Sequence, residues 1–377
     1  MYLQRPALKA GEKIMVAMSG GVDSSVAALL LKEAGFKPVG VTLRFWVDPA
    51  AEKKAADAGR GCCSLENIDD ARKVAAALNI PHYVFDMQEI FHEQVVTYFI
   101  REYLEGRTPN PCIACNKHLK FSHLLQKLRA LGINYLATGH YARILYEPQN
   151  NLYRLFRARD KEKEQSYMLY TLRQEQLSAL LFPLGDYLKK EVKELARKKG
   201  LKVAQKRESQ EICFIPDHDY RGFLAREHPQ VLTPGEIVSA AGQKLGMHRG
   251  VAFYTVGQRK GLGLASRHPL YVVKIDPRNN VLIVGKEEET YSGYLMATEL
   301  SFVAGAPPLH PLEVEVKIRY RASPVPAILH PPEGDRARVV FTRKQKAVTP
   351  GQAVVFYQGE EVLGGGIIIS SEIDEQV

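Results

Sequence analysis

The sequence predicts an α/β domain with a parallel sheet, followed by a small central β-domain and a C-terminal β-barrel. In the first half, short apolar strands alternate with helical segments, which is the pattern of a parallel sheet covered by helices. From about residue 233 the pattern changes to short β-rich segments separated by Gly, Pro and Asn. A length of 377 residues is sufficient for two or three domains. We place the domains at residues 1–208, 209–288 and 289–377.

Four short apolar runs are the predicted strands of the parallel sheet, at residues 14–17, 39–43, 82–85 and 135–138. Helical spacing of apolar residues predicts helices at 26–31, 67–78, 90–104, 119–131 and 188–201. Residues 50–61 have no firm apolar face, so we expect a surface excursion or mobile loop there. Because the carboxyl ends of parallel strands surround one crevice, the loops after the first, second and fourth strands should meet at a ligand.

In the second half, residues 271–275 and 281–284 predict a hairpin, since the turn residues at 276–280 separate two apolar strands. Alternating apolar and polar residues predict barrel strands within 313–320, 338–341, 353–357 and 362–369. The boundary between the two β-rich domains is expected near residues 286–293.

The chain is basic, with 51 Lys and Arg against 42 Asp and Glu and a formal net charge of +9. Such a charge suits a partner rich in phosphate. The helix at 188–201 is rich in lysine and arginine, which predicts either a solvated face or a contact with RNA phosphates. No apolar run is long enough to cross a membrane, and residues 1–13 lack the apolar region of a signal peptide. We therefore expect a cytoplasmic protein without a membrane partner.

The rest of the chain is organised around the sequence A-M-S-G-G-V-D-S-S at residues 17–25. It follows a predicted strand and precedes a predicted helix, so its glycines and serines can bring N–H and hydroxyl donors to a phosphate at the helix N-terminus. An ordinary turn with a helix cap at Asp23 or Ser24 is the alternative. The pattern fits neither G-x-x-x-x-G-K-[ST] nor G-x-G-x-x-G. It resembles the S-G-G-x-D-S signature of the PP-loop ATP pyrophosphatases, which bind the pyrophosphate of ATP in an adenine-nucleotide α-hydrolase-like fold.

Five cysteines, an odd number in a large chain, favour metal or redox chemistry over a disulfide framework: Cys62, Cys63, Cys112, Cys115 and Cys213. The sequence T-P-N-P-C-I-A-C-N at 108–116 places two of them in C-x-x-C spacing before a helix, whose N-terminus should lower the thiol pKa. A structural zinc site would need a fourth ligand, from a histidine or from the pair at 62 and 63. Separately buried, inert thiols are a second interpretation. Nucleophilic or iron–sulfur cluster chemistry explains both the spacing and the position.

Eight motifs in this order resemble the bacterial tRNA-specific 2-thiouridylases of the MnmA type. They are S-G-G-V-D-S-S at 19–25, C-C-S at 62–64, G-R-T-P-N-P-C-I-A-C-N at 106–116, T-G-H-Y-A at 138–142, E-Q-S-Y at 164–167, S-Q-E-I-C-F at 209–214, Y-T-V-G-Q-R-K-G-L-G at 254–263 and K-I-R-Y-R at 317–321. Several are weak alone, but together they are specific. The resemblance extends from residues 19–25, which we call the glycine turn, to the final predicted strands.

This resemblance implies that oxygen is exchanged for sulfur at C2 of the wobble uridine in certain tRNAs. ATP, with Mg²⁺, would adenylate the C2 oxygen. Sulfur from a donor protein would arrive as a persulfide on Cys213, and Cys115 would be the catalytic nucleophile, forming a disulfide with Cys213 as sulfur is released. The partners implied are tRNA and the sulfur donor, with no DNA.

The resemblance also implies three groups of binding residues. The positions that match ATP contacts are Ala17, Met18, Ser19, Gly20, Gly21, Val22, Asp23, Ser24, Leu43 and Gly139. Those that match the segment meeting the target base are Asn110, Pro111 and Cys112. Those that match tRNA contacts are His140, Lys163, Glu164, Gln165, Arg319, Tyr320 and Gln352.

One departure from the family concerns Cys112, because many members have Asp at this position. A C-x-x-C pair with one distant cysteine is the ligand set of related tRNA thiolation enzymes that hold an iron–sulfur cluster. We therefore hypothesise that Cys112, Cys115 and Cys213 bind a cluster that carries the attacking sulfide. For Cys62 and Cys63 a structural role is the expectation. The alternative functions are another PP-loop synthetase, which would adenylate a small substrate and add ammonia, and a non-catalytic RNA-binding protein.

Overall fold

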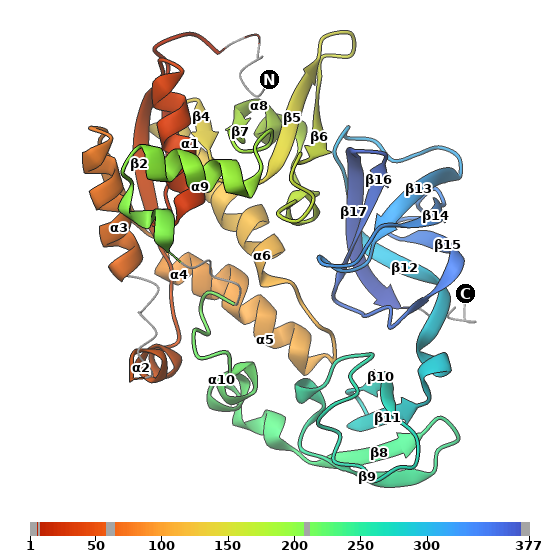
Figure 1. Ribbon diagram of the computed structural model, residues 1–377. Coiled ribbons are helices and arrows are strands. Elements are labelled where there is room, and N and C mark those ends of the chain that lie inside the picture. Colours follow the sequence, from red (N-terminus) through yellow and green to blue (C-terminus); the bar gives the residue numbers. More distant parts are fainter. Residues whose placement is uncertain (1–5, 7, 58–64, 207–211, 371–377) are drawn as a thin grey trace.

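The computed structural model describes residues 6, 8–57, 65–206 and 212–370. Cys62 and Cys63 lie outside the described residues. The chain folds into three parts (Figure 1). An α/β part is built from the first half of the chain, a four-stranded sheet follows it, and a β-barrel is built from the last strands. No helix in the described ranges has the length and apolar character needed to span a membrane.

The N-terminal sheet is parallel throughout, with the order β3-β2-β1-β4-β7. Its strands are β1 (Lys13–Ala17), β2 (Lys37–Arg44), β3 (His82–Asp86), β4 (Tyr135–Ala137) and β7 (Leu180–Leu181). The strand order reverses between β1 and β4, so the crevice at a topological switch point lies directly beyond the carboxyl end of β1. The glycine turn begins at that end, as expected from the sequence.

Helices cover both faces of this sheet (Figure 1). On one side α1 (Val22–Glu33) packs with α3 (Leu65–Ala77) and α9 (Lys189–Lys198) in one apolar cluster. A second cluster includes α5 (Thr97–Leu104), α7 (Leu124–Ala130) and α8 (Gln174–Ala179). The predicted helix at 90–104 is a continuous run of α4 (Gln88–Phe91), a π-helical segment (His92–Val96) and α5.

Two helical segments differ from the sequence-based expectation. The expectation of a loop at 50–61 was wrong for its first part, because α2 (Pro49–Asp57) forms there and buries Ala51 against the core. A single buried alanine is too weak a signal to reveal an amphipathic helix from sequence. The C-x-x-C sequence itself lies in a helical segment, which consists of α6 (Pro111–Ala114) and a π-helical stretch (Cys115–His123) before α7.

The central part follows α10 (Tyr220–Glu227) and contains β8 (Gly235–Ser239), β9 (Lys244–His248), β10 (Tyr271–Asp276) and β11 (Val281–Gly285), in the order β10-β11-β8-β9. The predicted hairpin is confirmed, since β10 and β11 pair antiparallel.

The C-terminal strands form a closed barrel of six strands. They are β12 (Tyr291–Phe302), β13 (Leu312–Lys317), β14 (Val325–Leu329), β15 (Ala337–Lys346), β16 (Ala353–Gln358) and β17 (Glu361–Ser370). The order is β12-β15-β14-β13-β16-β17, and β12 closes the barrel on β17. Alternate residues such as Val316, Val339 and Phe356 fill the interior.

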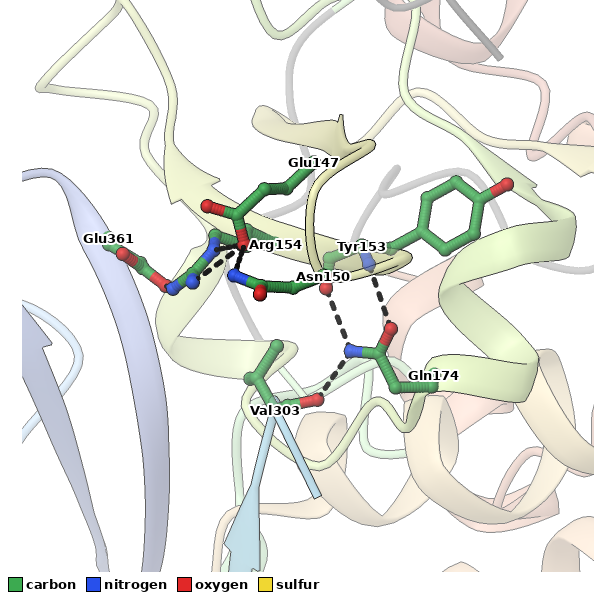
Figure 2. Close-up of polar contacts among 7 residues, drawn as sticks. All are labelled: Glu147, Asn150, Tyr153, Arg154, Gln174, Val303 and Glu361. Atoms are coloured by element: carbon green, nitrogen blue, oxygen red, sulfur yellow. Dashed lines mark hydrogen bonds and ion pairs between the residues drawn. The ribbon is translucent and has the colours of Figure 1, made fainter. Parts of the chain in front are cut away.

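A hairpin of the first half is joined to this barrel. Strands β5 (Ala142–Glu147) and β6 (Leu152–Arg157) extend the barrel sheet through pairing of β6 with β17. Figure 2 shows the polar contacts at this junction, where Arg154 donates to Glu147 and to Glu361 of β17. The Gln174 amide of α8 donates to the carbonyls of Tyr153 and Val303. The barrel is therefore attached to the α/β part through the hairpin β5–β6 and α8.

Candidate functional site

The glycine turn forms a cradle between β1 and α1. Gly20 has a φ of +70°, and a Cβ there would lie 2.2 Å from the Asn67 carbonyl oxygen, so the turn requires glycine at this position. Helix α1 begins with Gly21 as its N-cap, and no side chain of the described residues caps it. The Ser19 N–H donates to Ser24 Oγ over 3.1 Å, which curls the turn around the helix start. Backbone N–H groups at an uncapped helix start suit an anion.

The loop after β4 lies directly on this cradle. A Cβ at Gly139 would lie 2.7 Å from the Ser24 backbone nitrogen, so only glycine permits this approach. The next residues fasten the loop, because the Tyr141 hydroxyl donates to Asp23 over 2.8 Å. On the other side, the Met18 N–H donates to the Val41 carbonyl at 2.7 Å, which ties the turn to β2. The structure thus brings the turn and Gly139 together. Leu43 lies on β2, the neighbouring strand.

A lysine that sequence reasoning assigned only to a basic helix also reaches the cradle. Lys189 Nζ lies 2.7 Å from both carboxylate oxygens of Asp23. Lys189 is buried, together with Val192 and Ala196 of α9. These residues are spaced i, i+3 and i+7 and therefore share one helix face. That spacing was the signal that could have separated Lys189 from the exposed basic residues.

We call residues 106–116 the cysteine loop; it includes α6, and a side chain caps the start of this helix. The Asn110 side chain accepts from the N–H groups of Cys112 at 3.1 Å and Ile113 at 3.4 Å, and Pro111 occupies the first turn. Cys112 is exposed and Cys115, one turn later, is buried. Both thiols thus lie within the first turns of one helical segment, whereas the sequence was expected to place them before a helix that begins at residue 119.

The other two parts of the chain hold this loop. The Gln352 amide of the barrel donates to the Thr108 carbonyl at 2.8 Å and to the Pro109 carbonyl at 3.4 Å. The Thr108 N–H donates to the Pro350 carbonyl at 2.8 Å, and its hydroxyl donates to Thr255 of the central part at 3.0 Å. The loop conformation thus depends on contacts from all three parts.

The thiol pKa values depart from the sequence-based expectation. Burial raises the pKa of Cys115, and desolvation by surrounding protein raises the pKa of Cys112 although its surface is exposed. Desolvation is the largest cause of both shifts, and its direction is opposite to the effect expected of the helix start. Lys120 opposes this effect and lowers both pKa values. Sequence reasoning missed Lys120, which donates to Asn116 at 3.1 Å one turn beyond the C-x-x-C sequence.

His140 follows Gly139 in the chain, and its ring contacts the helical segment that begins at Cys115. Its ring packs against Phe121 and Phe182, at centroid distances of 5.6 and 5.8 Å. Burial lowers the pKa of His140 to about 3, with a further contribution from Lys120. The imidazole is therefore neutral at physiological pH. Its Nδ1 lies 2.7 Å from Thr138 Oγ1, so a hydrogen bond fixes the ring orientation.

Models of known protein families match the three parts of the chain. Residues 12–217 match the tRNA methyl transferase HUP domain, residues 221–286 the tRNA methyl transferase PRC-barrel domain, and residues 292–368 the aminomethyltransferase beta-barrel domain. The chain is 52% identical over 361 residues to tRNA-specific 2-thiouridylase MnmA 1 of Caldanaerobacter subterraneus subsp. tengcongensis, covering 96% of this chain and 99% of that protein. It is 50% identical to the MnmA of Carboxydothermus hydrogenoformans, covering 95% and 97%. The MnmA of Moorella thermoacetica is 52% identical, covering 94% and 99%.

The chain belongs to the family of tRNA-specific 2-thiouridylases. The names of two domain models refer to methyl transfer, whereas the relatives that match nearly the whole chain are named as thiouridylases. The sequence-based prediction of the family is confirmed. So is the fold class, with its N-terminal parallel sheet, its small central domain and its C-terminal barrel.

In this 2-thiouridylase, several positions expected to contact tRNA are engaged within the protein. The Gln165 side chain accepts from the Tyr141 N–H at 3.0 Å. Glu164 pairs with Lys317 of the barrel at 3.7 Å, and both side chains are nearly buried. Lys163 lies in the turn where its N–H donates to Asp160, at 3.2 Å. Of the three, Glu164 joins the α/β part to the barrel, and tRNA contact by all three stays a prediction.

Two barrel residues lie in the loop after β13. The exposed Arg319 donates to the Ala347 and Lys346 carbonyls. Tyr320 packs against Tyr167 at a centroid distance of 6.0 Å, and burial raises its pKa to about 12. A smaller contribution to that pKa comes from Cys112.

Cys213 precedes the buried Phe214, which packs among Phe91, Phe99 and Phe223. Cys213 is exposed, and Cys112, Cys115 and Cys213 carry reduced thiols in this structure. Among the residues that the structure describes, no three His, Cys, Asp or Glu side chains are arranged to hold a metal ion. The three cysteines therefore do not form a ligand set for an iron–sulfur cluster in this conformation, and we derive no step through such a group.

Proposed function

We propose that this chain catalyses ATP-dependent 2-thiolation of the wobble uridine in tRNA. The observation that carries the proposal is a continuous path from the phosphate cradle to the thiols. Gly139 lies against the cradle at Ser24, and His140 follows it in the chain. Lys120 influences the pKa of His140 and those of both loop thiols. A nucleotide and a thiol could therefore act on one base.

In the proposed reaction the cradle holds the phosphates of ATP. The uncapped start of α1 and the Ser19 and Ser24 hydroxyls offer donors to an anion. Mg²⁺ accompanying ATP would neutralise part of the phosphate charge. The uridine C2 oxygen attacks the α-phosphorus and pyrophosphate leaves, so AMP becomes the leaving group at C2. The base has to leave the anticodon stack to reach the loop at Asn110, Pro111 and Cys112.

The sulfur step follows thiol–disulfide chemistry. A donor protein would load Cys213 as a persulfide, whose terminal sulfur attacks C2 and displaces AMP. The Cys115 thiolate then attacks the Cys213 sulfur, which releases the thiolated base and leaves a Cys115–Cys213 disulfide. Each cycle thus requires a two-electron reductant to reopen this disulfide, and then a fresh donor to reload Cys213. Because burial raises the pKa of Cys115, the thiolate fraction, and with it this step, should increase with pH.

The test is tRNA thiolation measured by nucleoside mass spectrometry with ATP and a sulfur donor. Cys115→Ser and Cys213→Ser should abolish 2-thiouridine while ATP binding persists. Pyrophosphate release that needs both ATP and unmodified tRNA would exclude a non-catalytic RNA-binding protein. Release with a small substrate plus ammonia, and none with tRNA, would favour another PP-loop synthetase.

The same assay separates the two sulfur sources. Wild-type protein and Cys112→Asp are purified anaerobically, and iron, acid-labile sulfide and thiolation are measured on each. Full activity without iron or sulfide supports the persulfide route. Iron that is present in active wild-type protein and lost with activity in Cys112→Asp supports the cluster.

A further inference from the structure

The carboxylate of Asp23 presents an electrostatic problem at the phosphate cradle. Asp23 is in the first turn of α1, whose uncapped N-terminus faces the crevice. A carboxylate there is stabilised by the helix dipole, but it repels a polyphosphate placed at the same helix end. An unneutralised Asp23 would therefore oppose the ligand for which the rest of the cradle is built.

Lys189, which is distant in the sequence, forms an ion pair with this carboxylate. Its Nζ contacts both Asp23 oxygens at 2.7 Å, and its side chain is 10% exposed against 32% for Asp23. The Tyr141 hydroxyl adds a third hydrogen bond at 2.8 Å, and its ring lies 5.8 Å from the same ammonium. Donors on two separate elements thus converge on one carboxylate.

The backbone of Lys189 is also fixed. Its N–H donates to Asp160 Oδ2 at 2.7 Å, and the preceding Leu188 N–H donates to Glu191 at 2.7 Å. Asp160 is buried and also accepts from the N–H of Glu162 at 3.0 Å. The start of α9 is therefore anchored independently of Asp23, and the ammonium is held in place for the carboxylate.

We propose that Lys189 is a positioning residue for ATP binding: it neutralises Asp23 and holds this carboxylate away from the triphosphate. The inference rests on the proposed function in that it takes ATP as the ligand of the cradle. Lys189 acts through Asp23 rather than on the phosphates. Its effect should therefore depend on the presence of the Asp23 charge.

The test measures the Kd of ATP by equilibrium dialysis in EDTA, so that no divalent cation bridges Asp23 and the phosphates. Lys189→Met should raise Kd about tenfold or more, which corresponds to at least 1.4 kcal/mol. Lys190→Met is the matched control, because it removes the same charge from the exposed neighbouring position and should leave Kd close to the wild-type value. Lys189→Arg keeps the charge and should restore most of the affinity.

The variant Asp23→Asn decides how Lys189 acts. If Lys189 works by neutralising Asp23, Asp23→Asn/Lys189→Met should bind ATP as tightly as Asp23→Asn alone. A tenfold loss that persists in the Asp23→Asn background would mean that Lys189 contacts the phosphates directly, and it would overturn the proposal. So would an unchanged Kd for Lys189→Met. Should Lys189→Met fail to fold, Asp23→Asn/Lys189→Met, which buries no lone charge, is compared with Asp23→Asn, and weaker ATP binding by the double variant would still overturn the proposal.

The outcome for the proposed function is read separately, from tRNA thiolation by the wild-type protein with ATP. Normal thiolation and wild-type ATP affinity in Lys189→Met would refute the role of Lys189 alone. A wild-type protein that neither binds ATP nor thiolates tRNA would refute both.

Discussion

Alanine at Gly20 should destabilise the N-terminal part, whereas alanine at the adjacent Gly21 should not. The φ of +70° at Gly20 costs a residue with a Cβ about 1–2 kcal/mol. The new Cβ would also lie 2.2 Å from the Asn67 carbonyl oxygen, well below the 3.0 Å limit, and the contact is with backbone that cannot rotate away. Forcing such a contact costs about 1–3 kcal/mol. We therefore expect Gly20→Ala to lower the free energy of unfolding by about 2–5 kcal/mol.

Gly21→Ala adds the same methyl group one residue later and serves as the control. Gly21 has a φ of −99°, and its added Cβ would meet only Ser19 Oγ at 3.5 Å, an ordinary contact. Glycine and alanine at a helix N-cap differ by about 1 kcal/mol or less. Urea unfolding followed by fluorescence of Trp46, the single tryptophan, measures both variants. Equal losses in the two variants, or none in Gly20→Ala, would show that the close approach to Asn67 is not a constraint.

Three further outcomes follow from the site. Lys120→Met should shift the alkylation of Cys112 by iodoacetamide to higher pH, because the lysine lowers the thiol pKa; an unchanged pH profile of the Cys112 peptide would contradict this. Gln352→Ala removes two hydrogen bonds to the cysteine loop and should reduce tRNA thiolation while the Kd of ATP is unchanged; loss of ATP affinity would show a wider role. Lys193→Glu with Arg197→Glu should weaken tRNA binding and flatten its salt dependence without affecting ATP, and equal tRNA affinity would assign α9 to a solvated face.

The parallel sheet and the cradle could be predicted because local signals and tertiary structure agree there. Each strand of the sheet but β7 is an apolar run bounded by turn residues, and the S-G-G sequence can only follow a strand and precede a helix in such a fold. Four of the six barrel strands, β13, β15, β16 and β17, were predicted for the same reason, as alternating patterns that the closed sheet requires. Strands β12 and β14 were not predicted from the sequence. Strand β7 has only two residues, which is too short for any periodicity.

The sequence could not show which distant elements meet. The hairpin β5–β6 lies among the residues of the first predicted domain, yet it pairs with β17 near the end of the chain. Lys189 was hidden for a related reason, since a lysine on a basic helix is usually solvated and only its partner Asp23, 166 residues away, explains its burial. Such pairings are set by tertiary packing rather than by local pattern. The thiol pKa values differ from expectation for the same reason, because desolvation depends on neighbours that the sequence does not reveal.

The contacts of the cysteine loop give the barrel a structural role in addition to any contact with RNA. Asn110 caps α6 locally, and one such cap contributes about 1 kcal/mol. Thr108 and Pro109, however, accept hydrogen bonds from Gln352, and Thr108 donates to the Pro350 carbonyl and to Thr255 of the central part. Each of these bonds has a net contribution of about 1 kcal/mol. Together these non-local contacts outweigh the local cap in fixing the loop that carries Cys112. It follows that the barrel helps to set the position of the thiols relative to the cradle, so movement of the barrel when RNA binds would alter the sulfur site directly.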